Sequence, residues 1–416
     1  MNAKCWKFYA VVLAFMYLSA VKEAGAVQAP NIEWERSYGG SDTDWSRAIQ
    51  QTKDGGYIVV GSSRSNDGDV TENHGGYDFW AVKLNFKGDI IWQKSLGDSE
   101  NENAYAVQQT TDGGFIVAGF THYREGDGLV IKLDSNGEIE WQKIYGGHER
   151  DSINDIRQTT DGGYIFTGYS RSYSLNDYVS GNHGEADCWV VKLDSKGAIL
   201  WQRVLGGSKH DEGNAVRQTK DGGYIISAYA ASSDGDVFVN HGARYFWLIK
   251  LDTTGKTIWQ KTFGYPSNGI ATSIQQASDE GYVVAGYTAS NYWIIKLDVE
   301  GNLLWQRVLG GTGTDWINSV DQTKDGGYIT AGQSDSKNGD VSGNHGSFDY
   351  WVVKLNAEGD LVWQKSLGGS WGERAYSIQQ TSDGGYIIAG DSNSGDGDVS
   401  GNHGDLDFWV VKLKSE

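Results

Sequence analysis

Apolar and polar positions follow one cassette that recurs seven times along the chain. Each cassette holds a strand with Trp-Gln-Lys or a close variant, a glycine turn, a polar strand, an Asp-Gly-Gly-Tyr turn and an apolar Trp-Val-Val-Lys-Leu run. In the first cassette this pattern predicts strands at residues 47–52, 57–62, 79–84 and 90–96. The seven turns begin at Asp54, Asp112, Asp161, Asp221, Asp279, Asp325 and Asp383.

A repeat of this size, rich in β-branched and aromatic residues, predicts an all-β fold, a seven-bladed β-propeller of four-stranded blades. The chain ends on a third strand, residues 409–413, so the last blade lacks its outer strand. We expect the N-terminal strand, residues 32–38, to complete that blade and remove an open sheet edge. One propeller domain then fills residues 27–416.

Antiparallel strands place the short turns on one face of the disc, here called the turn face. The long and variable connections lie on the other face, here called the loop face. Binding residues are common on loops held by a rigid scaffold, so we expect function on the loop face.

Residues 1–26 resemble a signal peptide, with Lys4 and Lys7 before the apolar stretch Phe8–Val21 and a small-residue site at 24–26. No later apolar run is long enough for a membrane helix. Cys188 is the only cysteine outside this segment, so no intramolecular disulfide is expected. These features predict a secreted, periplasmic or cell-surface protein without membrane insertion.

The net charge of −19 opposes binding to nucleic acid. No catalytic motif with a nucleophile, base and orienting group appears, and the polar residues of interest recur in many blades whereas a catalytic site is singular. We therefore expect a protein that is not an enzyme and has no cofactor other than possible calcium. The oligomeric state is not predicted.

Three tryptophans fall outside the repeat pattern, in the predicted connections of blades 1, 6 and 7. Trp45, Trp316 and Trp371 are each near a carboxylate, Asp44, Asp315 and Glu373. Indole faces beside carboxylate acceptors suit a sugar, so these six residues are the candidate ligand site. The alternative is that each indole covers the end of its own blade.

Long inserts between second and third strands carry an Asp-Gly-Asp-Val motif. Its carboxylates are candidate calcium ligands, although the motif lacks the final bidentate Glu of an EF-hand loop. Asx turns that stabilise a long loop without metal explain the same residues. The candidate ligands are Asp67, Asp69, Asp234, Asp236, Asp396 and Asp398.

A glutamine near the end of each first strand recurs in all seven blades, which predicts a structural role within the ring. The seven are Gln51, Gln109, Gln158, Gln218, Gln276, Gln322 and Gln380.

The cassette resembles the Asp-Gly-Gly-Tyr-Ile propeller repeats of secreted and surface proteins of bacteria and archaea, over residues 31–413. This resemblance implies the fold and an extracytoplasmic setting, with no activity or site residues. Residues 192–201 also resemble the tryptophan-docking repeats of quinoprotein dehydrogenases. The chain differs from that family in having seven repeats instead of eight and no adjacent cysteine pair, so a cofactor-free scaffold like the related envelope-assembly propellers is expected.

We therefore expect an extracytoplasmic binding module whose loop face recognises a glycan or cell-surface polymer. The alternative is a protein-interaction scaffold of the cell envelope. A polysaccharide-active or quinone-dependent enzyme is the third interpretation.

Overall fold

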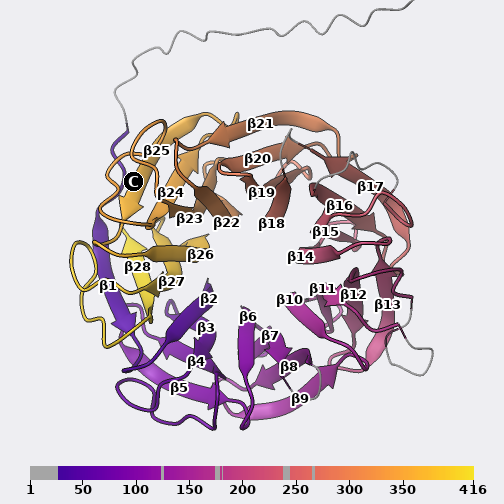
Figure 1. Cartoon of the computed structure of the whole chain (residues 1–416), viewed down its shortest axis with the longest axis horizontal. Helices are drawn as coiled ribbons and strands as arrows, with labels where there is room; N and C mark the ends of the chain where they lie inside the picture. The colour runs from indigo at the N-terminus through magenta and orange to yellow at the C-terminus, as the bar shows by residue number, and fades with distance from the viewer. Residues whose placement is uncertain (1–26, 123–125, 174–178, 180, 238–243, 265–267) are drawn as a thin grey trace, which may run out of the picture.

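The computed structural model describes residues 27–122, 126–173, 179, 181–237, 244–264 and 268–416. Within these ranges every regular element is a β-strand, and the strands form seven four-stranded antiparallel sheets arranged in a ring (Figure 1). No helix in this part of the chain could span a membrane. The predicted signal peptide lies outside the described residues. The predicted seven-bladed, all-β propeller is confirmed.

Each blade runs from an innermost to an outermost strand. The innermost strands are β2 (Asp44–Gln51), β6 (Glu102–Gln109), β10 (Asp151–Gln158), β14 (Asp211–Gln218), β18 (Gly269–Gln276), β22 (Asp315–Gln322) and β26 (Glu373–Gln380). The second strands are β3 (Tyr57–Ser63), β7 (Phe115–Thr121), β11 (Tyr164–Ser170), β15 (Tyr224–Ala230), β19 (Tyr282–Thr288), β23 (Tyr328–Ser334) and β27 (Tyr386–Ser392). The third strands are β4 (Asp78–Leu84), β8 (Asp127–Leu133), β12 (Asp187–Leu193), β16 (Tyr245–Leu251), β20 (Tyr292–Leu297), β24 (Asp349–Leu355) and β28 (Asp407–Leu413). The outermost strands are β5 (Ile90–Leu96), β9 (Ile139–Tyr145), β13 (Ile199–Leu205), β17 (Thr257–Phe263), β21 (Leu303–Leu309), β25 (Leu361–Leu367) and β1 (Ile32–Tyr38).

The N-terminal strand β1 closes the ring. It pairs antiparallel with β28, in register from Ile32 opposite Leu413 to Tyr38 opposite Phe408. The two strands, indigo and yellow, lie side by side in Figure 1. The backbone N–H of Lys414 also donates to the carbonyl of Asn31 (3.0 Å). The predicted completion of the last blade is confirmed.

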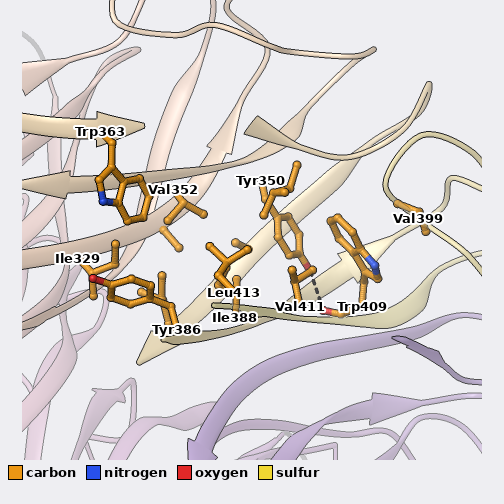
Figure 2. Packing of buried hydrophobic residues seen from close by; sticks show 14 residues of the cluster. Ile329, Tyr350, Val352, Trp363, Tyr386, Ile388, Val399, Trp409, Val411 and Leu413 are labelled. Carbon is orange, nitrogen blue, oxygen red and sulfur yellow. Dashed lines mark hydrogen bonds between the residues drawn. The ribbon is translucent and has the colours of Figure 1, made fainter. Parts of the chain in front are cut away.

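The core lies between neighbouring blades, because the middle strands are buried on both faces. Figure 2 shows the cluster between blades 6 and 7, where the tilted rings of Trp409 and Tyr350, with centroids 4.6 Å apart, pack with Val411 and Leu413. The Tyr350 hydroxyl donates to the carbonyl of Trp409 (2.9 Å), which satisfies its polar atom inside the apolar cluster. The third-strand tryptophans are therefore core residues.

Outermost-strand tryptophans connect each blade to the next. Gly359, in the turn between β24 and β25 of blade 6, has φ of +81° and lies under the Trp305 ring of the preceding blade. The Trp305 Nε1 donates to the carbonyl of Ala357 in the same turn (3.3 Å). Blade 7 has no such turn because the chain begins and ends there, and Trp363 Nε1 donates instead to Glu416 Oε1 (2.9 Å).

The seven glutamines form a hydrogen-bonded belt near the turn face. The side-chain oxygen of each accepts a backbone N–H from the preceding blade, as from Lys53 to Gln109 (2.8 Å) and from Ser382 to Gln51 (2.8 Å). The same link joins every pair of blades, at 2.7 to 2.9 Å. The belt satisfies backbone groups at the blade boundaries, so the predicted structural role is confirmed.

Candidate binding site in the central channel

The innermost strands begin earlier than the sequence predicts. β2 starts at Asp44 rather than residue 47, because pairing with β3 continues past a bulge between Ser46 and Ala48. Trp45 and Trp316 therefore lie on strands, and the prediction that they are loop residues is wrong. Trp371 does lie in a loop, two residues before β26.

The carboxylates predicted to accompany the indoles are buried. Asp44, Asp315 and Glu373 are each 0 % exposed and bond to the preceding glycine turn rather than facing solvent. Asp44 Oδ2, for example, accepts the Gly40 N–H and the Ser65 hydroxyl, both at 2.8 Å. Burial raises the pKa of all three carboxyls. These hydrogen bonds hold the connections on the loop face in place.

The three indoles have different surroundings. Trp45 is half-buried and stacks on Tyr77, with ring centroids 5.0 Å apart and planes 9° apart. Trp316 packs between Tyr287 and Phe348, at 5.5 and 6.4 Å. Trp316 is 37 % exposed and Trp371 is 64 % exposed, so Trp371 presents the most open indole on the loop face.

The Asp-Gly-Asp carboxylates accept hydrogen bonds from the neighbouring glycine turn. Asp67 Oδ1 accepts the Ser41 N–H (2.7 Å), and Asp69 Oδ2 accepts the Gly39 N–H (3.3 Å). The same contacts recur at Asp234, Asp236, Asp396 and Asp398. Among the described residues no group of three or more His, Cys, Asp or Glu side chains is arranged to hold a metal ion.

Histidines in the inserts between second and third strands of blades 1, 3, 6 and 7 bond to buried carboxylates, which sequence reasoning missed. His403 Nδ1 lies 2.8 Å from Asp407 Oδ2, and the His403 backbone N–H donates to the same oxygen (2.7 Å). The signal was the spacing of four residues between the histidine and the first residue of the third strand. The other three pairs are His74–Asp78, His183–Asp187 and His345–Asp349.

The bulge leaves one unpaired residue per blade in the central channel, where Figure 1 shows the innermost strands converging. These residues are Arg47, Tyr105, Asn154, Asn214, Thr272, Asn318 and Tyr376. In blades 3 to 6 the side chain donates to a carbonyl of the next blade, as from Asn318 to Ala375 (2.7 Å). Blades 7, 1 and 2 carry larger side chains at this position.

These larger side chains help to line a cavity of about 360 Å³, here called the loop-face cavity. The Arg47 guanidinium lies 4.0 Å from the Tyr376 ring centroid and 5.7 Å from that of Trp45. Burial raises the pKa of Tyr105 and Tyr376, so both hydroxyls keep their protons near neutral pH. The lining residues are Arg47, Tyr105, Glu212, Asn214, Tyr229, Ile270, Thr272, Tyr287, Asn318 and Tyr376.

Aromatic side chains recur near the loop-face end of the inner strands, and two of them, Tyr229 and Tyr287, line this cavity. At one cross-strand pair in each of blades 1 to 6, either the innermost or the second strand supplies an aromatic residue. The pairs are Trp45–Ser62, Asn103–Phe120, Ser152–Tyr169, Glu212–Tyr229, Ile270–Tyr287 and Trp316–Gln333. Blade 7 has the charged pair Arg374–Asp391 instead. The loop-face end of the channel thus combines aromatic rings with a few charges.

A second cavity of about 300 Å³ lies deeper in the channel, here called the turn-face cavity. It contains two arginines, Arg157 and Arg217, and one carboxylate, Asp321. Burial raises the pKa of Asp321 to about 6 although both arginines act to lower it. The lining residues are Ala48, Ile49, Gln50, Val107, Gln108, Arg157, Arg217, Gln275, Ser319, Val320, Asp321, Ile378 and Gln379.

Sequence reasoning missed both sets of channel residues because it gave weight to positions that repeat. The informative signal is the opposite one, a position that varies within an otherwise repeated strand. Arg47, Tyr105 and Tyr376 replace Asn or Thr, while Arg157, Arg217 and Asp321 replace Gln.

Solved structures share the fold at low sequence identity. Sqt1 from Chaetomium thermophilum is 13% identical with a TM-score of 0.51, over 93% of this chain and 100% of that chain. A chain of the COPII outer coat vertex on membranes is 12% identical with a TM-score of 0.52, over 91% of this chain and 85% of that chain. Puromycin hydrolase is 14% identical with a TM-score of 0.51, over 85% of this chain and 51% of that chain, so this protein spans about half of that enzyme. These matches show the propeller fold alone.

Comparison with curated proteins gives no match. One protein family matches residues 186–399, just over half of the 416-residue chain, and these residues run from blade 3 into blade 7. The chain therefore belongs to the family described as outer membrane protein assembly factor BamB.

Proposed function

We propose that this protein is an extracytoplasmic interaction module that binds a segment of an envelope protein at the loop-face cavity. The observation that carries the proposal is the convergence of Arg47, Tyr105 and Tyr376 on one cavity that Tyr229 and Tyr287 also line. Tyr, Trp and Arg are enriched among the residues that contribute most of the binding energy at protein interfaces.

The setting supports a protein partner. The cavity is held by strands rather than mobile loops, so a binding segment would meet a surface that is already ordered. The name of the family refers to assembly of outer membrane proteins. The signal-peptide pattern at residues 1–26 supports export to the compartment where such partners occur.

Site-specific photocrosslinking in cells tests this proposal. A photoreactive residue at Arg374, exposed at the loop-face end, should give a discrete adduct with an envelope protein. The same residue at Lys53, on the turn face, should give none. Equal adducts from both faces, or none from Arg374, would contradict the proposal.

Glycan binding is the second candidate, carried by the open indole of Trp371. A sugar ring could stack on its exposed face. A glycan array of the mature protein and of Trp371→Ala tests this candidate. Signals that disappear in the variant would support a lectin, and a blank array would remove the candidate.

A further inference from the structure

The turn-face cavity breaks the sevenfold repeat at one position, the residue before each belt glutamine. Four blades have glutamine there, Gln50, Gln108, Gln275 and Gln379. In three of these the side-chain oxygen accepts the backbone N–H of the next blade, at 2.6 to 2.8 Å. Glutamine is thus the structural solution, and blades 3, 4 and 6 depart from it with Arg157, Arg217 and Asp321.

Among the residues that the structure describes, both arginines contact the same carboxylate and no other. Asp155, which is 4 % exposed, lies 3.1 Å from Arg157 Nε and accepts a hydrogen bond from Arg217 Nη1 (2.5 Å). Arg157 Nε is buried, and despite this ion-pair contact it makes no hydrogen bond to any described residue. One carboxylate between two guanidinium groups leaves a local excess of one positive charge, which is costly in a partly desolvated site.

Asp321 places a negative charge at the same cavity and forms no ion pair with the described residues. Its Oδ2 accepts the Gln380 backbone N–H (3.3 Å), as the glutamines do in other blades. Within the described part of the chain it makes no salt bridge within 4.0 Å. The cavity therefore holds positive and negative groups that are both available to a third partner.

We propose that the turn-face cavity binds a small zwitterionic solute of the α-amino acid class. Its carboxylate would bond to Arg157 and Arg217, and its ammonium group would face Asp321. Planar guanidinium groups bind carboxylates through paired, charge-assisted hydrogen bonds. The volume of about 300 Å³ is at the lower end for small-molecule pockets and suits a compact ligand. This site is separate from the loop-face cavity, and its occupancy does not depend on a protein partner.

Calorimetry and thermal unfolding with the full mature protein test the proposal. The probes are the twenty proteinogenic L-amino acids, with propionate and ethylamine as ligands that carry only one of the two charges. At least one amino acid should bind saturably and raise Tm, while propionate and ethylamine should not. Absence of binding by every amino acid, or equal binding of propionate, would overturn the proposal.

Two variants introduce at this cavity the glutamine that four other blades carry at the same position. Arg157→Gln and Asp321→Gln should fold, because glutamine occupies this position in four blades, and each should weaken amino acid binding by at least about tenfold. Arg64→Gln, which removes an exposed arginine on the loop face, is the control and should bind normally. Undiminished binding in the two cavity variants would also overturn the proposal.

Discussion

At the scale of single residues, buried and turn carboxylates have opposite pKa shifts. Partial burial acts to raise the pKa of Asp325, but hydrogen bonds from Lys354, Thr323 and the turn backbone lower it to about 2. Burial raises the pKa of Asp391 to about 6, and Asp407 behaves in the same way. The turn carboxylates therefore favour the folded state when ionised, and the buried carboxylates favour it when protonated.

These shifts predict a stability maximum at mildly acidic pH. Asp391 binds its proton more tightly in the folded than in the unfolded protein. Its contribution to stability therefore becomes more favourable as pH falls through about 6 towards the unfolded pKa near 4. The turn carboxylates lose their contribution below about 4, as pH falls towards about 2. Tm should therefore rise from pH 7.5 to 5 and fall below pH 4. Asp391→Asn should reduce the rise in Tm between pH 7.5 and 5 without changing the fall below pH 4. A Tm that falls steadily from pH 7.5 to 5 would refute this account.

Lys354 is the buried partner in an ion pair at the turn face. Its side chain is 1 % exposed, and Nζ bonds to Asp325 Oδ2 (2.8 Å) and to the carbonyl of Leu355 (3.2 Å). Lys354→Met should lower the free energy of unfolding by about 1–3 kcal/mol, because the carbonyl loses its buried donor. Denaturant unfolding measures this. Lys94→Met, at the exposed pair with Glu138, is the control and should cost no more than about 1 kcal/mol; equal costs would argue against burial as the cause.

At the scale of elements, the blades are joined by a tryptophan lying on the next blade's turn. Gly359 (φ +81°) and Gly326 (φ +84°) have nearly the same backbone conformation. A Cβ at Gly359 would lie 2.9 Å from the Trp305 ring, whereas a Cβ at Gly326 would meet nothing within 4 Å. The two positions separate backbone strain from the contact between blades.

Alanine at these two glycines gives the matched comparison. Gly326→Ala should cost about 1 kcal/mol for a left-handed conformation. Gly359→Ala should cost at least about 1 kcal/mol more, because the indole must also move. Urea unfolding measures both values. Equal costs would show that Trp305 docking contributes little to the joint between blades.

The repeat made the strands and turns predictable, because apolar periodicity and glycine turns report local structure directly. The closing strand was also predictable, since an outer strand was missing at one end and present at the other. The bulge was not, because a single extra residue in β2 leaves no mark in the apolar pattern. Once it moved Trp45 onto a strand, the predicted sugar platform no longer described that residue's surroundings, where Tyr77 covers one indole face.

At the scale of the whole molecule, the ring is held closed by β1 and by the belt of glutamines. Deleting residues 27–39 would remove the outermost strand of blade 7 and expose the edge of β28. Tm should fall by at least about 10 °C, because the deletion removes several kcal/mol from the free energy of unfolding of a ring that unfolds as one cooperative unit. Calorimetry checks this. Appending residues 31–39 after Glu416 through a flexible linker should restore most of the loss, and failure to restore it would show that β1 acts by another route.

The central claim is that the variable side chains of the loop-face cavity bind a protein segment. The decisive measurement compares photocrosslinking from Arg374 in the wild-type protein and in Tyr105→Asn/Tyr376→Asn. Asparagine occupies this position in three other blades, so the variant should keep its fold by circular dichroism and gel filtration. The account predicts that the adduct falls at least about tenfold, the loss expected for hot-spot residues. An undiminished adduct from a folded variant would contradict it.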